Sequence, residues 1–213
     1  MLKQIQRFKL EVKEYIITES DRLFSQYGFK SVTMDDIAKQ LGVSKRTIYQ
    51  HFSDKDELVN MLIDGKLDMY EDELKAYAEE GVNAVQEVFL GIAHIDEWLN
   101  TINAKLFYDL QKYHHTAWLK FKNFKENSLA VGIVENIKRG MQEGVYRRNL
   151  NIDVLTQLRL EQGNIILNTL HKYTSTEVWI EITQHFLYGI CSLKGKVLIE
   201  EYKKQLTTNN YKN

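Results

Sequence analysis

The fold of this chain is decided by residues 33–52, which read TMDDIAKQLGVSKRTIYQHF. Thr33 is a favourable helix N-cap, and the two aspartates that follow Met34 suit the first turn of a helix. Gly42 supplies the backbone freedom for a sharp turn, and Ser44 caps a second helix. The spacing therefore predicts two short helices joined by a tight turn.

The apolar residues of this stretch recur at helical spacing. Those expected to face inward are Ile37, Ala38, Leu41, Val43, Ile48 and Phe52. The polar side chains of the second helix, predicted from Lys45 to His51, then remain on or near the outer surface. A helix of this kind fits the major groove of DNA, so the stretch predicts a DNA-reading helix-turn-helix.

The chain on either side of this stretch is also predicted to be helical. A helix over residues 5–27 ends at Gly28, and a long helix begins at a cap near Ser53 or Asp54 and runs to about Glu80. Further helices are predicted over residues 82–101, 102–114, 118–143, 153–171 and 177–206. These patterns predict an all-α fold of about nine helices, with a head (residues 1–53) and a helical body (residues 54–213).

Composition agrees with a folded helical protein. The 213 residues are 44% hydrophobic and 27% charged, and they include no proline, so long uninterrupted helices are allowed. The net charge of −1 hides an asymmetry, because residues 1–53 hold nine Lys/Arg and six Asp/Glu whereas the remainder holds 19 and 23. A mildly basic head on an acidic body fits a nucleic-acid-binding end.

Several other classes of protein are disfavoured by the sequence. Cys191 is the only cysteine, so no disulfide forms within the chain, as expected for the cytoplasm. No apolar run predicts a signal peptide or a membrane span. We predict no metal site, cofactor or enzymatic activity, since His94 and Glu97 are the only paired ligand spacing and no catalytic motif is present.

The head resembles the TetR family of bacterial transcription regulators over about forty residues. The matching residues are Leu23-Phe24, Tyr27-Gly28-Phe29, Val32-Thr33-Met34, Asp36-Ile37-Ala38, Leu41-Gly42-Val43-Ser44, Thr47-Ile48-Tyr49, His51-Phe52 and Lys55-Asp56-Glu57-Leu58. The resemblance implies a three-helix DNA-binding domain and a bundle of about six helices that forms a dimer. It also implies that a small molecule in the body changes the separation of the two heads and releases the operator.

Eight residues are candidates for DNA contact. Lys45, Arg46 and Thr47 lie near the start of the second helix, where side chains reach base edges and an arginine can bind guanine through two hydrogen bonds. The others are expected to contact phosphates or to cap the helix: Thr33, Ser44, Tyr49, His51 and Lys55. Structural alternatives stay open, because Thr33 and Ser44 are good caps without DNA and Tyr49 and His51 can serve as packing.

The body is rich in aromatic residues between Trp98 and Phe124. Aromatic residues at helical spacing are usually core, and the alternative is the wall of a ligand cavity, which is concave and mostly apolar. The candidate pocket residues are Trp98, Asn103, Phe107, Tyr108, Trp118, Phe121 and Gln162, with His114 and Asn168 as further polar candidates.

Two apolar helix faces, over about 153–171 and 177–206, predict a homodimer through a four-helix interface. The alternative is that these faces pack only within the chain. We therefore expect a dimeric repressor that binds a palindromic operator in double-stranded DNA and is released by a small-molecule effector. The competing hypotheses are a regulator of the same fold without a small-molecule ligand (an activator or a protein-controlled regulator) and a helical ligand carrier or enzyme.

Overall fold

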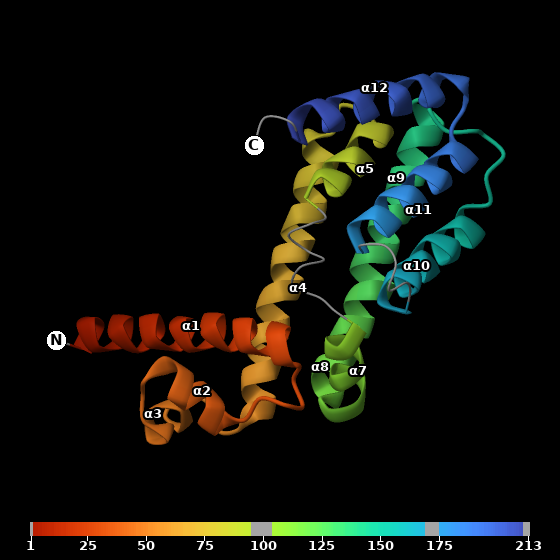
Figure 1. Cartoon of the computed structure of the whole chain (residues 1–213). Coiled ribbons are helices and arrows are strands. Elements are labelled where there is room, and N and C mark those ends of the chain that lie inside the picture. Colours follow the sequence, from red (N-terminus) through yellow and green to blue (C-terminus); the bar gives the residue numbers. More distant parts are fainter. Residues whose placement is uncertain (1, 95–103, 169–174, 211–213) are drawn as a thin grey trace. The chain divides into compact units, whose positions relative to one another are not determined.

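The structure is a computed structural model that describes the backbone of residues 2–94, 104–168 and 175–210 and the side chains of residues 11–94, 105–165 and 176–206. Within these ranges the ordered elements are helices, with one isolated β-bridge between Tyr146 and Cys191. The all-α prediction is confirmed (Figure 1). No helix in the described ranges has the length and apolar character needed to cross a membrane.

The chain divides into two compact units, which are described separately. The first consists of Met1–Asp68 and Ile102–Lys122, and the second of Met69–Thr101 and Asn123–Asn213. The boundary predicted at residue 53 falls inside the first unit, and the division into residues 1–53 and 54–213 stays a prediction.

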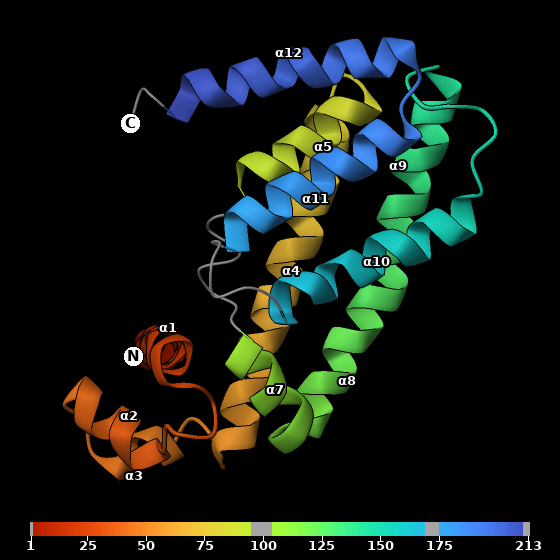
Figure 2. The same cartoon turned by 45° about the vertical axis from the view of Figure 1, so that its right-hand side comes forward.

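The first unit combines the helix-turn-helix with helices from much later in the sequence. Its helices are α1 (Leu2–Tyr27), α2 (Met34–Leu41), α3 (Lys45–Tyr49), α4 (Lys55–Glu80) as far as Asp68, α7 (Ala104–Tyr113) and α8 (His115–Asn123) as far as Lys122 (Figure 2). Gly28 ends α1 with a φ of +85°, and its N–H donates to the Phe24 carbonyl at 2.7 Å. Glycine suits this position because a side chain would strain a left-handed backbone.

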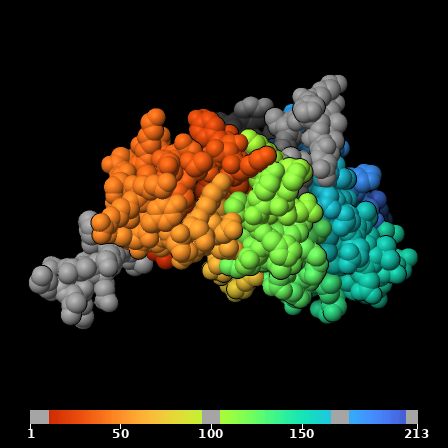
Figure 3. All heavy atoms as spheres, turned by 90° about the horizontal axis from the view of Figure 1, so that it is seen from below, coloured from red at the N-terminus to blue at the C-terminus, as the bar shows by residue number. Residues whose placement is uncertain are grey.

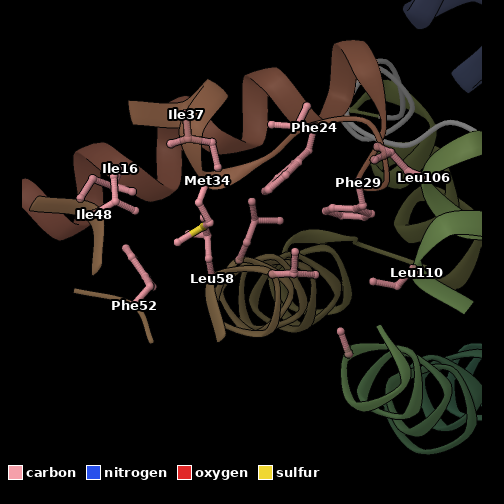
Figure 4. Close-up of a cluster of buried hydrophobic side chains, with 14 of the residues drawn as sticks. Ile16, Phe24, Phe29, Met34, Ile37, Ile48, Phe52, Leu58, Leu106 and Leu110 are labelled. Carbon is pink, nitrogen blue, oxygen red and sulfur yellow. The ribbon is translucent and has the colours of Figure 1, made fainter. Parts of the chain in front are cut away.

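All six helices contribute side chains to the core of the first unit. The buried residues include Ile16 and Phe24 of α1, Ile37 of α2 and Ile48 of α3 (Figure 4). The list is completed by Phe29, Val32, Met34, Ala38, Phe52, Leu58, Val59, Leu62, Leu106, Leu110 and Ala117. In the space-filling view the atoms of α7 and α8 lie directly against those of residues 28–60 (Figure 3). The helix-turn-helix and α7–α8 therefore share one hydrophobic core.

The second unit is built from the remainder of α4 and the C-terminal helices. These are α5 (Ala84–Ala93), the π-helix η1 (Phe124–Leu129), α9 (Ala130–Gln142), α10 (Ile152–Asn168), α11 (Ser175–Ile190) and α12 (Leu193–Asn210). Tyr146 lies at the centre of this core, 1% exposed, and its hydroxyl donates to the Ala84 carbonyl or to Asn136 Oδ1, which lie 3.0 and 2.9 Å away. Burial raises the pKa of Tyr146 well above its ordinary value.

The prediction of one helix over residues 177–206 is wrong, because the chain turns between α11 and α12. At this turn the backbone of residues 190 and 192 forms hydrogen bonds with residues 145 and 147 in place of helical ones. The Arg147 N–H donates to the Ile190 carbonyl, and the Ser192 N–H donates to the Val145 carbonyl, both at 2.9 Å. The Ser192 hydroxyl accepts from Gly195 N–H at 3.2 Å, which caps α12.

Two other predicted helices differ in detail from the structure. The one expected over residues 118–143 is the continuous series α8, η1 and α9, with a π-helical segment in its middle. The one expected over residues 82–101 begins as α5, which ends at Ala93, and residues 95–103 lie outside the described ranges. Cys191 is a free, buried thiol, and burial raises its pKa to about 12.

Candidate nucleic-acid interface

Side-chain hydrogen bonds cap the N-terminus of α2 and the N-terminus of α3. Thr33 N–H donates to Asp36 Oδ2 at 2.9 Å, while Asp36 N–H donates to Thr33 Oγ1 at 3.2 Å, a reciprocal capping box. The Thr33 hydroxyl also donates to Asp36 Oδ2 at 2.6 Å and holds the pKa of that carboxyl below its ordinary value. Gly42 follows α2 with a φ of +66°, as the predicted turn requires.

The start of α3 is capped by Ser44 alone, without a reciprocal bond. Ser44 Oγ accepts from Thr47 N–H at 3.1 Å and lies 2.8 Å from Thr47 Oγ1. Ile48 is fully buried beneath these residues, so the packing fixes which face of α3 points outward. The predicted roles of Ser44 as a cap and Ile48 as core are both present in the structure.

The two cations at the start of α3 have different surroundings. Lys45 Nζ lies 2.6 Å from Asp35 Oδ1 and 5.9 Å from the Tyr49 ring centroid, and its hydrogen bond to Asp35 raises its pKa. Arg46 is exposed, and its side chain makes no hydrogen bond or ion pair within the described ranges. Because Asp35 partly neutralises Lys45, Arg46 is the more available cation for an anionic or base partner.

The remaining DNA candidates range from exposed to half-buried. Tyr49 is 43% exposed, whereas His51 is half-buried with its ring 6.5 Å from that of Phe52. Lys55 is also half-buried: its ammonium donates to the Phe29 carbonyl and lies 5.9 Å from the Phe24 ring centroid. Burial lowers the pKa of Lys55. The structure thus gives Lys55 an internal partner that the sequence did not reveal, and its contact with DNA stays a prediction.

Known proteins similar to this chain are also helix-turn-helix regulators. The family profile described as "Bacterial regulatory proteins, tetR family" matches residues 16–62, which contain α2 and α3. The uncharacterized HTH-type transcriptional regulator YvaF of Bacillus subtilis is 30% identical over 180 residues, which cover 82% of this chain and 93% of YvaF. This chain belongs to the TetR family. It is a DNA-binding transcriptional regulator and not an enzyme.

Solved structures of transcriptional regulators share the fold over more than four fifths of this chain. A TetR family regulator from Agrobacterium tumefaciens superposes with a TM-score of 0.74 at 15% identity and covers 86% of this chain and all 100% of its own. FadR from Bacillus subtilis, solved in complex with stearoyl-CoA, has a TM-score of 0.66 at 19% identity and covers 82% of this chain and 97% of its own. At these identities the likeness concerns the fold.

The predicted ligand-pocket residues of this TetR regulator do not all lie in one unit. Phe107, Trp118 and Phe121 belong to the first unit, where the Phe107 and Phe121 ring centroids are 4.8 Å apart and those of Trp118 and Phe121 are 5.6 Å apart. Tyr108 of the same unit is 54% exposed. The residues outside the described side chains are Trp98, Asn103 and Asn168.

Among the pocket candidates whose side chains are described, Gln162 lies in the second unit. It is buried, and its Oε1 accepts from Arg159 Nη1 at 3.1 Å. Arg159 was not among the residues predicted from the sequence, although an arginine between Leu158 and Leu160 in an apolar helix is a signal for such a residue. The pocket assignment stays a prediction. No group of three or more His, Cys, Asp or Glu side chains in the described ranges is placed to hold a metal ion.

A part-buried polar contact joins the start of α4, beside the helix-turn-helix, to His114 between α7 and α8. His114 is 6% exposed; its Nδ1 lies 2.5 Å from Asp56 Oδ1 at the start of α4, and its ring lies 5.5 Å from that of Phe29. Asp109 of α7, 3% exposed, accepts from Lys30 N–H at 2.8 Å. The loop before α2 is therefore fixed by side chains that come from α7 and from the residue between α7 and α8.

We expect acid to weaken the first unit through His114. Burial lowers the pKa of His114, and the Asp56 hydrogen bond only partly opposes this, so the unfolded chain takes up a proton more readily than the folded protein. This contribution to stability is present above the unfolded pKa of about 6.5 and is lost as the pH falls below it. Thermal unfolding at pH 7.5 and 5.5 should show a lower Tm at pH 5.5, and a smaller difference in His114→Gln. The control is His115→Gln, because His115 is an exposed neighbour. If the wild type and both variants show the same difference in Tm between the two pH values, His114 does not cause the acid sensitivity.

Proposed function

We propose that this TetR regulator is a homodimeric repressor that binds a palindromic operator through its recognition helix, Ser44–Phe52, and is released when a small molecule binds its C-terminal domain, residues 54–213. The observation that carries the proposal is the exposed start of α3, where Arg46 has no partner in the described ranges and Ser44 caps the helix. Capped helices of this type enter the major groove with their N-terminal residues against base edges.

The eight candidate DNA residues divide by their structural surroundings. Arg46 is free to contact a guanine, and Lys45 can do so once it leaves Asp35. Thr33 and Ser44 stand at the starts of α2 and α3, where the positive end of the helix dipole favours a phosphate. Together with Thr47, Tyr49, His51 and Lys55, these residues form the proposed operator-binding surface.

An exposed apolar face of α10 supports the dimer. Val154 is 61% exposed, Leu158 49% and Ile165 43%, and their spacing places all three on one side of the helix. A second copy of the chain, related by a two-fold axis, would bury the same residues on both subunits. A two-fold dimer also explains why a palindromic operator is expected, because two recognition helices then meet two equivalent half-sites.

The proposed release of the operator by a small molecule is supported by the resemblance to the family and by a solved relative with a bound ligand. FadR was solved with stearoyl-CoA, so a chain with this fold can hold a small molecule. A regulator controlled by a protein partner, or an activator, would share the DNA-binding surface but not lose operator binding when a small molecule is added. Titration of the labelled operator in the presence of candidate ligands separates these functions.

A charge on the exposed face of α10 tests the dimer. Leu158→Lys should raise the Kd of dimerisation by roughly 30-fold or more, or about 2 kcal/mol, because two lysines would enter one apolar interface. Light scattering after size-exclusion chromatography measures the mass, and fluorescence anisotropy with the DNA upstream of the gene measures operator binding. Gln157→Lys is the matched control, since residue 157 is exposed and lies about 100° further round the helix. A Leu158→Lys protein that stays dimeric and binds DNA normally would rule out this interface.

A further inference from the structure

Two arginines of the second unit have opposite surroundings. Arg139 of α9 bonds two carboxylates, with Nε 2.7 Å from Glu143 Oε1 and Nη1 3.3 Å from Glu87 Oε2, and the Glu143 hydrogen bond raises its pKa. Arg159 of α10 is half-buried and bonds no carboxylate within the described ranges. A cation removed from water normally has an anionic partner, so Arg159 is the exception.

The partners of Arg159 are neutral. Its Nη1 donates to Gln162 Oε1 at 3.1 Å and its Nη2 to Thr183 Oγ1 at 2.9 Å, while the guanidinium carbon lies 4.3 Å from the Trp179 ring centroid and 5.6 Å from that of Phe186. The two rings and two hydrogen bonds fix the orientation of the guanidinium. Its other N–H groups, Nε–H included, have no acceptor in the described part of the chain. Burial lowers the pKa of Arg159 to about 10, so the side chain is still charged at neutral pH.

A second unpaired donor lies one turn away. Thr156 is 5% exposed, and its hydroxyl has no hydrogen-bond partner in the described ranges. Buried hydroxyl groups without a partner are uncommon in folded proteins. Residues 156 and 159 share one side of α10 because they are three apart, and this side is opposite the exposed Val154 and Leu158. The two donors therefore point away from the proposed dimer face.

We propose that the second unit binds an organic anion, a carboxylate or phosphate carried on an apolar body, with Arg159 as its charge partner and Thr156 as a second donor. A guanidinium presents its N–H groups in a planar fork that matches both kinds of anion. Trp179 and Phe186 supply apolar surface beside the charged group. A stacking role for Arg159 alone would leave the Thr156 hydroxyl unexplained. The inference rests on the proposed function only in taking this anion as the effector.

Three probes with the same ten-carbon chain test the charge preference: decanoate and decyl phosphate, each below its micelle-forming concentration, and decan-1-ol, below its solubility limit. Thermal unfolding of the full chain should show a larger rise in Tm with at least one of the two anions than with the alcohol. Which anion gives the larger rise distinguishes a carboxylate from a phosphate ligand. Equal rises with all three probes, or no rise with either anion, would overturn the proposal.

Variants locate the site. Arg159→Met should weaken binding of the preferred anion at least about tenfold, or about 1.4 kcal/mol, because it removes a charged hydrogen bond to the anion, and Thr156→Val should weaken it less. Arg148→Met removes the same charge from an exposed position and should bind as the wild type does. Unchanged anion binding by Arg159→Met would overturn the proposal.

The Tm measured without any probe distinguishes a ligand-binding role of Arg159 from a role in stabilising the fold. Arg159→Met should leave the Tm unchanged or raise it, because the variant no longer buries an unpaired cation; a large fall would assign Arg159 to the fold and overturn the proposal. Operator binding is followed in the same samples. A protein that fails to bind DNA but shows the anion-dependent Tm shifts would contradict the proposed repressor function and leave the anion site standing.

Discussion

Arg46→Ala should weaken binding to the operator by about 1–3 kcal/mol for each half-site, so that a two-fold dimer loses about twice this amount. Arg46 is exposed at the start of α3 and has no partner in the described ranges. The stability of the protein without DNA should therefore change little when the side chain is removed. The measurement is fluorescence anisotropy with operator DNA, repeated with random-sequence DNA of the same length. Specific binding should fall much more than binding to the random sequence, because an arginine that reads a base discriminates between sequences.

The matched control is Arg22→Ala in α1. Its guanidinium lies 2.9 Å from Glu19, its side chain is 74% exposed, and it belongs to the same unit. This variant changes the net charge equally and should bind the operator almost as tightly as the wild type. An equal loss on both DNAs would assign Arg46 to the phosphate backbone, and no loss on either would remove it from the interface.

Leu110→Ala should destabilise the helix-turn-helix although the two lie far apart in the sequence. Leu110 of α7 is 4% exposed and belongs to the same core as Phe24, Ile37 and Ile48 (Figure 4). Truncating a buried leucine costs about 2–5 kcal/mol, because apolar contacts are lost and a cavity remains. Hydrogen exchange of the backbone amides in residues 33–52 should report this loss as a lower free energy of opening.

Tyr108→Ala, on the same helix at a position that is 54% exposed, is the control and should leave those amides unchanged. The result also decides the extent of the DNA-binding domain. A head of residues 1–53 that folds independently predicts no effect of Leu110→Ala on the helix-turn-helix. A shared core predicts that α7 stabilises the operator-binding surface directly.

The sequence predicted the helix-turn-helix well because its determinants are local. Thr33 and Ser44 cap helices that begin within one residue of them, and Gly42 has the positive φ that the turn requires. Ile48 is core because helical spacing places it opposite the exposed side chains. These features depend on neighbours within a few positions, which a single sequence contains.

The features that the sequence did not predict depend on distant contacts. The turn after α11 is held by bonds between residues 190–192 and 144–147, and no proline marks it. The aromatic residues of α7 and α8 were interpreted either as core or as the wall of a ligand pocket, and the sequence did not show that Trp118 and Phe121 pack against the core that α2 and α3 share. Asp35 also lies beside Lys45 across the turn, a pairing that helical periodicity does not show.

The central claim is that two copies of α3 read one operator, with Arg46 at the contact. Its most direct test is selection of genomic DNA fragments by the purified full-length protein, followed by sequencing, with Arg46→Ala protein in parallel. The account predicts that the wild type enriches a short inverted repeat whose half-site centres are roughly 10 base pairs, or a multiple of this, apart, and that Arg46→Ala loses this enrichment. Enrichment of a single unrepeated site, of no sequence, or of the same repeat by Arg46→Ala would contradict it.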